Sequence, residues 1–139
     1  MNILVPVDGS TTAKRAAKYA INMARNDPSV EITLLAVACL HTEAKFEASG
    51  MMNEPTNDEC NNLFNARLEE AKKMFDDAGV KVKADFMQGD AASSIIAYAD
   101  KFKIDQIIMG SKGMGGFKGL GSVTYKVLNG VRKPVTVIK

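Results

Sequence analysis

The sequence predicts an α/β fold: a single domain over residues 1–139, with an open, mainly parallel five-stranded sheet and helices on both of its faces. Short apolar runs alternate with longer segments of helical periodicity. The segments between successive apolar runs are long enough for the crossovers that parallel strands require. With 46% hydrophobic residues and a net charge of +2, the composition is that of a globular domain rather than a disordered chain.

The N-terminal part of the chain predicts two buried strands with a helix between them. Residues 3–7 are almost wholly apolar, as in a strand that is buried on both faces. Ser10 is the expected N-cap of a helix whose alanines keep helical spacing up to the stop signal at residues 26–28. Residues 31–38 are the second buried strand. The polar stretch 41–57 has no sustained period, and we expect a loop there, beside the ligand-binding edge of the sheet.

The middle of the chain predicts two further helices and a strand between them. A helix from residue 58 has its large apolar residues on one face and ends at Gly79. The following strand, residues 80–86, alternates apolar and charged residues, so one of its faces is more exposed and it should lie near an edge of the sheet. Asp90 is the expected N-cap of the next helix.

A glycine-rich segment without acidic residues follows the fourth predicted strand, residues 107–109. All 16 acidic residues lie before position 106, and seven of the 11 glycines lie between residues 110 and 130. Close backbone approach and positive potential both favour an anion, so the segment suits a phosphate site at the start of the short predicted helix 122–129. A basic surface loop without a ligand would share these features. Residues 134–138 form the last predicted strand.

Missing motifs exclude several functions. No Walker A motif can be read, and Lys118 stands where the last glycine of a dinucleotide fingerprint belongs. The single histidine, His41, lies in the polar stretch, so a Ser-His-Asp triad is unsupported and no catalytic residue is assigned. Cys39 and Cys60 predict neither a disulfide framework nor a zinc site; we expect Cys39 to be a small buried side chain and Cys60 a helix residue.

The apolar runs are too short for a membrane helix, which needs roughly 18 residues. The first apolar run has no basic leader before it, and it is therefore expected to be a strand rather than a signal peptide. We expect a cytoplasmic protein with neither a membrane nor a nucleic acid as its partner.

Two motifs together resemble the nucleotide-binding branch of the universal stress protein family. These are residues 110–123 (GSKGMGGFKGLGSV) and residues 5–10 (VPVDGS). The resemblance covers the whole chain, including residues 88–90 (QGD) and 133–138 (KPVTVI). It implies a Rossmann-like fold of the adenine nucleotide alpha hydrolase-like type. It also implies a stress-response role, a regulatory protein partner, and a homodimer that pairs through the last strand.

The resemblance further implies that the protein binds ATP, with ADP or AMP as alternatives. Asp8 would lie at the ribose, the phosphates or a divalent ion, Mg²⁺ or Mn²⁺, and Val37 would present its backbone to adenine. The alternative for Asp8 is a turn or cap residue before the first helix. The implied binding residues are Pro6, Val7, Asp8, Ser10, Val37, Met109, Gly110, Gly113, Gly121, Ser122 and Val123.

The phosphate half of the motif departs from the family pattern. That pattern is G-x2-G-x9-G-[ST], whereas only seven residues separate Gly113 from Gly121. We expect the shorter segment to bind nucleotide still, but to hold the phosphates more weakly than a full-length one. Two alternatives stay open: a nucleotide-free dimeric interaction protein, and a slow ATPase or autokinase modified at Ser122 or Thr124. No dedicated general base stands out, which argues against fast hydrolysis.

Overall fold

The computed structural model describes residues 1–39, 56–112 and 119–139. Within these ranges five parallel strands form one sheet in the order β3-β2-β1-β4-β5. The strands are β1 (Asn2–Pro6), β2 (Glu31–Ala38), β3 (Val82–Gln88), β4 (Gln106–Gly110) and β5 (Val135–Ile138). The helices are α1 (Thr11–Asn26), α3 (Asn57–Asp77), α4 (Ala91–Lys101) and α5 (Ser122–Gly130).

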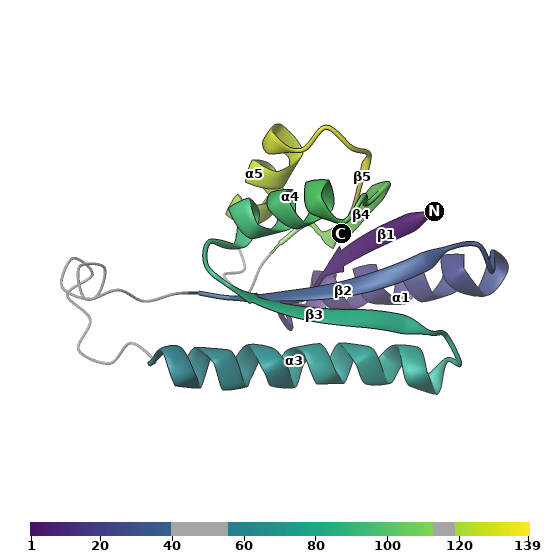
Figure 1. Ribbon diagram of the computed structural model, residues 1–139, viewed down its shortest axis with the longest axis horizontal. Helices are drawn as coiled ribbons and strands as arrows, with labels where there is room; N and C mark the ends of the chain where they lie inside the picture. Colours follow the sequence, from purple (N-terminus) through teal and green to yellow (C-terminus); the bar gives the residue numbers. More distant parts are fainter. Residues whose placement is uncertain (40–55, 113–118) are drawn as a thin grey trace.

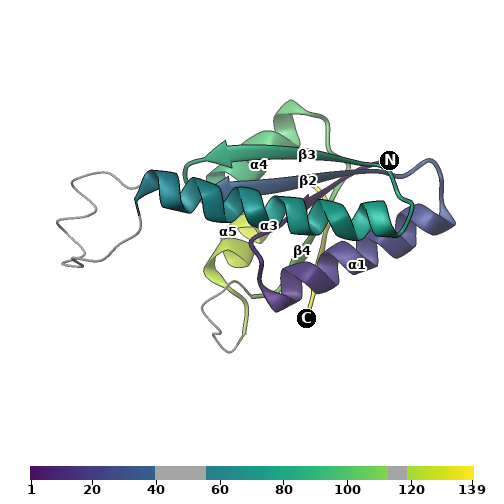
Figure 2. The same cartoon turned by 90° about the horizontal axis from the view of Figure 1, so that it is seen from below.

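Helices cover both faces of the sheet. In Figure 1, α4 and α5 lie on one side of the strands, and α1 and α3 lie on the other. Figure 2 shows α1 and α3 side by side across their common face. The predicted fold class is therefore confirmed.

The central strands are buried on both faces, as their apolar sequences predict. Along β1, Ile3 and Val5 belong to the core under α1 and α3, whereas Leu4 belongs to the core under α4 and α5. The same alternation separates Leu34 from Leu35 on β2. These five side chains are at most 1% exposed. Strands with two buried faces are mostly apolar along their length, so a polar site is expected where the strands end.

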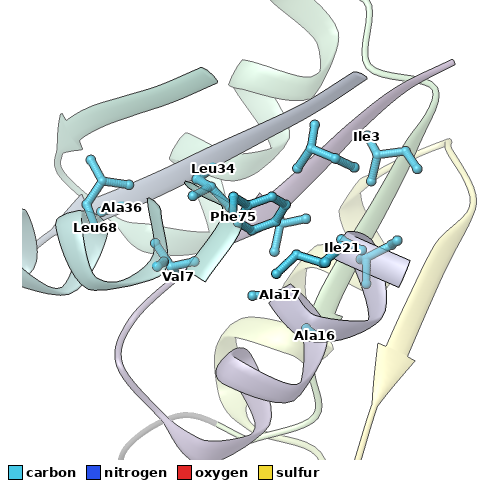
Figure 3. Packing of buried hydrophobic residues seen from close by; sticks show 14 residues of the cluster. Ile3, Val7, Ala16, Ala17, Ile21, Leu34, Ala36, Leu68 and Phe75 are labelled. Atoms are coloured by element: carbon cyan, nitrogen blue, oxygen red, sulfur yellow. The ribbon is translucent and has the colours of Figure 1, made fainter. Parts of the chain in front are cut away.

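The core under α1 and α3 is centred on one aromatic side chain. Phe75 projects from α3 toward the sheet beside Leu34, and residues of α1, Ala17 and Ile21 among them, close the other side (Figure 3). Phe75 is fully buried. Truncating such a side chain to alanine removes about 3–5 kcal/mol of stability, so this contact fixes α3 on the sheet.

The element ends agree with the sequence predictions to within two residues. β3 is an edge strand, as its alternating pattern predicts. It begins at Val82 rather than at residue 80, and β1 ends at Pro6 rather than at residue 7. The predicted loop 41–57 lies, as far as residue 55, outside the described residues. No helix within the described ranges combines the length and the apolar character that crossing a membrane requires.

Candidate functional site

A cavity of about 430 Å³ lies beyond the carboxyl ends of β1, β2 and β4. The first turns of α1, α4 and α5 and the side chain of Phe64 on α3 complete its wall. β1 and β4 are the neighbours between which the strand order reverses, and ligands of open α/β sheets bind at this place. The volume falls in the range of small-molecule sites.

Ten of the 11 residues predicted to bind the ligand line this one cavity. They are Pro6, Val7, Asp8, Ser10, Val37, Met109, Gly110, Gly121, Ser122 and Val123. The remaining one, Gly113, lies outside the described residues. Three chain segments that are far apart in sequence therefore meet at one place, although what each residue binds stays a prediction.

Asp8 forms the turn between β1 and α1. Its Oδ1 accepts a hydrogen bond from the backbone N–H of Ser10 at 2.8 Å, and Gly9 between them has a φ of +82°. Asp8 therefore has the turn role predicted as the alternative, and it lines the cavity as well. Among the described residues, its second oxygen, Oδ2, has no hydrogen-bond partner. This oxygen can accept from a ligand hydroxyl or coordinate a cation.

The backbone N–H and C=O of Val37 lie beyond the point at which β1 stops pairing with β2. The N–H of Val7, just after β1, donates to the carbonyl of Leu35 at 2.9 Å. Because alternate residues of a strand direct their N–H and C=O to the same side, those of Val37 point past the end of β1. Val37 lines the cavity there. A donor and an acceptor side by side are what the edge of a planar heterocycle can match.

The end of β4 is packed against the start of α1. A Cβ on Gly110 would lie 2.4 Å from the Thr12 Oγ1 and 2.6 Å from the backbone nitrogen of Ala13, so only glycine fits. Thr12 Oγ1 also donates to the carbonyl of Lys112 at 2.7 Å and accepts from its N–H at 3.2 Å. These contacts hold Lys112 at the wall of the cavity.

The start of α5 is fastened to the same strand end. Thr124 Oγ1 donates to the carbonyl of Gly110 at 2.8 Å, and the N–H of Gly121 donates to the carbonyl of Ser111 at 2.7 Å. Both Thr124 and Ser122 line the cavity, but Thr124 is buried with its hydroxyl bonded to β4, whereas Ser122 is exposed.

The first turn of α5 differs from those of the other described helices. Side-chain oxygens of Ser10, Thr56 and Asp90 accept from first-turn N–H groups of α1, α3 and α4. α5 begins after Gly121, which has no side chain, and its cap position makes no side-chain hydrogen bond. Its first N–H groups therefore lack an acceptor from the cap residue, and they lie at a wall of the cavity. Such a helix end suits an anion.

The sequence matches the model of the universal stress protein family over residues 1–139. The chain belongs to this family. It is 32% identical to universal stress protein MJ0531 of Methanocaldococcus jannaschii over 142 residues, which covers 99% of this chain and 81% of the relative. It is 33% identical to universal stress protein MJ0577 of the same organism over 152 residues, with coverages of 99% and 93%. The predicted family resemblance is thereby confirmed.

Solved structures of universal stress proteins share the fold. The structure of MJ0577 superposes with a TM-score of 0.78 at 31% identity, covering 99% of this chain and 94% of that one. A universal stress protein described in complex with cAMP has a TM-score of 0.73 at 22% identity, covering 100% and 97%. A family member from Arabidopsis thaliana described with AMP bound has a TM-score of 0.71 at 22% identity, covering 100% and 91%.

The wall of the cavity in this universal stress protein also contains residues outside the predicted set, Phe64 and Ile95 among them. Phe64 lies on α3 and Ile95 lies on α4. Their apolar character and spacing are those of core residues, so no sequence signal marks them. Both lie near helix starts that extend toward the carboxyl edge of the sheet, and they make the cavity wall partly apolar.

Cys39 corrects an expectation. The prediction of a small buried side chain at this position is wrong, because Cys39 is exposed. β2 ends at Ala38, whose carbonyl accepts from the N–H of Gly89 at 2.9 Å, and Cys39 follows outside the sheet. It lines the cavity next to the predicted residues. Cys60 is a helix residue, as expected, and it is buried.

Proposed function

We propose that this universal stress protein binds an adenine nucleotide, ATP foremost, in the cavity beyond β1, β2 and β4. The observation that carries the proposal is the convergence of ten predicted residues on one cavity that has an uncapped helix at its wall. Solved family members are described with cAMP, AMP or dAMP bound, at 20–22% identity to this chain. Their ligands share the adenine and the phosphate for which the two ends of this cavity are suited.

The adenine would lie against the carboxyl end of β2. The backbone N–H and C=O of Val37 supply the polar edge there, and Ile95 and Met109 supply apolar surface for the ring. Asp8 Oδ2 is the oxygen suited to a ribose hydroxyl, since Oδ1 is already bonded to the N–H of Ser10. An apolar slot with a few fixed polar groups is the usual form of a site for a planar ligand.

The phosphates would lie at the start of α5. The N–H groups at Ser122 and Val123 and the positive end of the helix favour an anion, and Lys112 adds a full charge at the same wall. A divalent ion would have Asp8 as its protein carboxylate, with further oxygens from the phosphates, in the manner common for Mg²⁺. Within the described ranges there is no cluster of three or more His, Cys, Asp or Glu side chains that could hold an ion by itself.

Calorimetry with ATP, ADP, AMP and adenosine tests this proposal on the purified chain. We expect all four to bind, and affinity to rise with the number of phosphates. Equal affinities would mean that the start of α5 holds no phosphate. Absence of binding for all four would overturn the proposal and favour the nucleotide-free interaction protein. Mass spectrometry of small molecules released from freshly purified protein is an independent check.

A charge variant locates the phosphates. Lys112→Gln should weaken ATP about fivefold, the effect of ~1 kcal/mol from one partly screened charge, and leave adenosine unchanged. Lys126→Gln is the matched control, because Lys126 lies on α5, is exposed and is not part of the cavity wall. Equal losses in the two variants would indicate general attraction by the basic segment instead of a contact at the cavity.

We also propose that two copies pair through β5. This strand is an edge of the sheet and its residues Val135, Val137 and Ile138 are apolar and only half-buried. Apolar edges promote pairing with another strand, and a two-fold axis would close both edges. Sedimentation should give a dimer that Val137→Lys dissociates, while Val82→Lys on the opposite edge strand leaves assembly intact. A wild-type monomer at micromolar concentration would contradict the pairing.

A further inference from the structure

The two cysteines of the chain meet in space. Cys39 Sγ lies 3.4 Å from Cys60 Sγ, although 21 positions separate them in sequence. Cys39 follows the last residue of β2, and Cys60 lies in the first turn of α3. The chain has only two cysteines in 139 residues, and the fold brings these two together. The proposed nucleotide contacts use neither sulfur, so nucleotide binding does not explain why the two cysteines lie together.

We propose that Cys39 and Cys60 are a redox-active dithiol, which a hydroperoxide converts into an intramolecular disulfide at the rim of the cavity. A disulfide bond is about 2.05 Å long, so the sulfurs need to approach by about 1.4 Å. The N–H of Cys60 donates to the carbonyl of Thr56 at 2.9 Å, within a turn that a capping box fixes. Cys39 lies outside β2, so we expect the Cys39 sulfur to move toward Cys60 when the bond forms.

The different exposures of the two sulfurs assign their roles. Cys39 is exposed and Cys60 is only 3% exposed, so the oxidant reaches Cys39 first. The Cys39 sulfur attacks the peroxide, the O–O bond breaks, and a sulfenic acid and one water or alcohol form. The Cys60 sulfur then attacks the sulfenic sulfur, the S–O bond breaks, and a second water leaves with the thiol proton. Two thiols lose two electrons, and the peroxide accepts them; a small dithiol reverses the change.

The position of the pair gives the disulfide a consequence for the site. Cys39 lines the cavity two residues after Val37, and Phe64 lines it one turn after Cys60 on α3. The bond would therefore join two walls of the cavity, the end of β2 and the start of α3. In a reducing environment the thiols would be the resting form, as is usual for redox-sensing pairs there.

The test uses the full chain, reduced and then freed of reductant. After equimolar hydrogen peroxide and alkylation under denaturing conditions, the intact mass should fall by two hydrogen atoms, with no alkyl group added. A non-reducing peptide map should link Cys39 to Cys60, and dithiothreitol should restore two alkylation sites. Retention of two alkylation sites after peroxide, or a product containing only disulfides between chains, would overturn the proposal.

Two isosteric variants test the order of events. In Cys60→Ser, Cys39 should stop at the sulfenic acid, which dimedone traps. In Cys39→Ser, buried Cys60 should oxidise at least tenfold more slowly than it does in the wild type. Equal rates of Cys60 loss with and without Cys39 would show that the pair does not act together. The readouts require no nucleotide, so failure of the proposed binding function would leave this test unaffected.

Discussion

Two helices begin at the same cavity and begin differently. α1 starts at Ser10, whose side chain accepts from the N–H of Ala13 at 3.2 Å, and Asp8 accepts from the N–H of Ser10 itself. α5 starts at Gly121, which offers no side-chain acceptor. The first-turn N–H groups of α1 therefore have a side-chain acceptor within the chain, whereas a bound anion can accept from those of α5. Of two similar helix ends in one wall, only one is left for a ligand.

Both helices are nevertheless held by one residue of β4. Gly110 lies directly against Thr12 and Ala13 of α1, and its carbonyl accepts from Thr124 of α5. Gly110 thus contacts the starts of both helices. Four substitutions test this difference between the two helix starts.

Gly110→Ala should disrupt the packing of β4 against the starts of α1 and α5. The added Cβ would lie 2.6 Å from the backbone of α1, which cannot give way like a flexible side chain, so we expect a loss of about 2–3 kcal/mol in the free energy of unfolding. Urea denaturation measures it. Gly79→Ala is the control: Gly79 has a φ of +72°, but an added Cβ there would have nothing within 4 Å, so only about 1 kcal/mol of backbone strain is expected. Equal losses would contradict the tight approach.

Gly121→Asp should make α5 resemble α1. A carboxylate at the cap position would accept from the first-turn N–H groups and repel phosphates, so ATP should bind at least tenfold more weakly, a change of roughly 1.4 kcal/mol, with adenosine unaffected. The φ of −67° at Gly121 suits any residue. Calorimetry on Gly121→Ser separates the cap from the charge. Unchanged ATP affinity in the aspartate variant would place the phosphates elsewhere.

Ser10→Ala should make α1 resemble α5. Loss of the cap bond to the N–H of Ala13 should lower the free energy of unfolding by about 1 kcal/mol. Because this helix end is proposed to serve the fold, the preference for ATP over adenosine should persist. Thermal unfolding and calorimetry on one preparation give both quantities. A selective loss of ATP affinity would assign phosphate binding to α1 instead.

The smallest effect concerns α4, the third helix that begins at the cavity. The hydroxyl of Tyr98 on α4 donates a hydrogen bond to the carboxylate of Asp85 on β3. Burial, followed by this bond and the charge of Asp85, raises the pKa of Tyr98 above its ordinary value near 10. The folded protein thus binds the Tyr98 proton more tightly than the unfolded chain does. The contribution of this proton to the free energy of unfolding is therefore complete below pH 10, and it is lost as the pH rises through the pKa of the folded form.

Tyr98→Phe should therefore cost only about 0.5 kcal/mol at neutral pH, since Asp85 is exposed and can bond to water instead. Urea midpoints measured between pH 8 and about pH 11 should fall less steeply in the variant than in the wild type. The same slope in both proteins would show that the hydroxyl has no part in alkaline unfolding.

The sequence was sufficient for what depends on local pattern. β2 was predicted at its observed ends, and Ser10 and Asp90 were predicted as caps, because an apolar run and a capping oxygen act within a few residues. The edge where the site lies was also predictable, since the carboxyl ends of parallel strands lie together. The cap role of Ser10 is confirmed, whereas its role in binding a ligand stays a prediction.

Contacts between distant segments could not be predicted in this way. Phe64 reaches the cavity because the start of α3 extends to that edge, and its spacing does not distinguish a wall residue from a core residue. The exposure of Cys39 and its approach to Cys60 depend on where β2 stops relative to α3. The strict need for glycine at Gly110 arises from Thr12, which lies about 100 positions earlier.

The place of β1 in the sheet has a consequence for the making of the protein. β1 is the first strand in sequence, yet it lies between β2 and β4, and its Asn2 N–H donates to Asp105 Oδ2 at 2.7 Å, 103 positions later. At ~5–20 residues per second, translation takes roughly 5–20 s to supply that second neighbour. During this interval one edge of an apolar strand is open on the ribosome. The emerging chain is therefore most vulnerable to aggregation, and most in need of a chaperone, until β4 has left the exit tunnel.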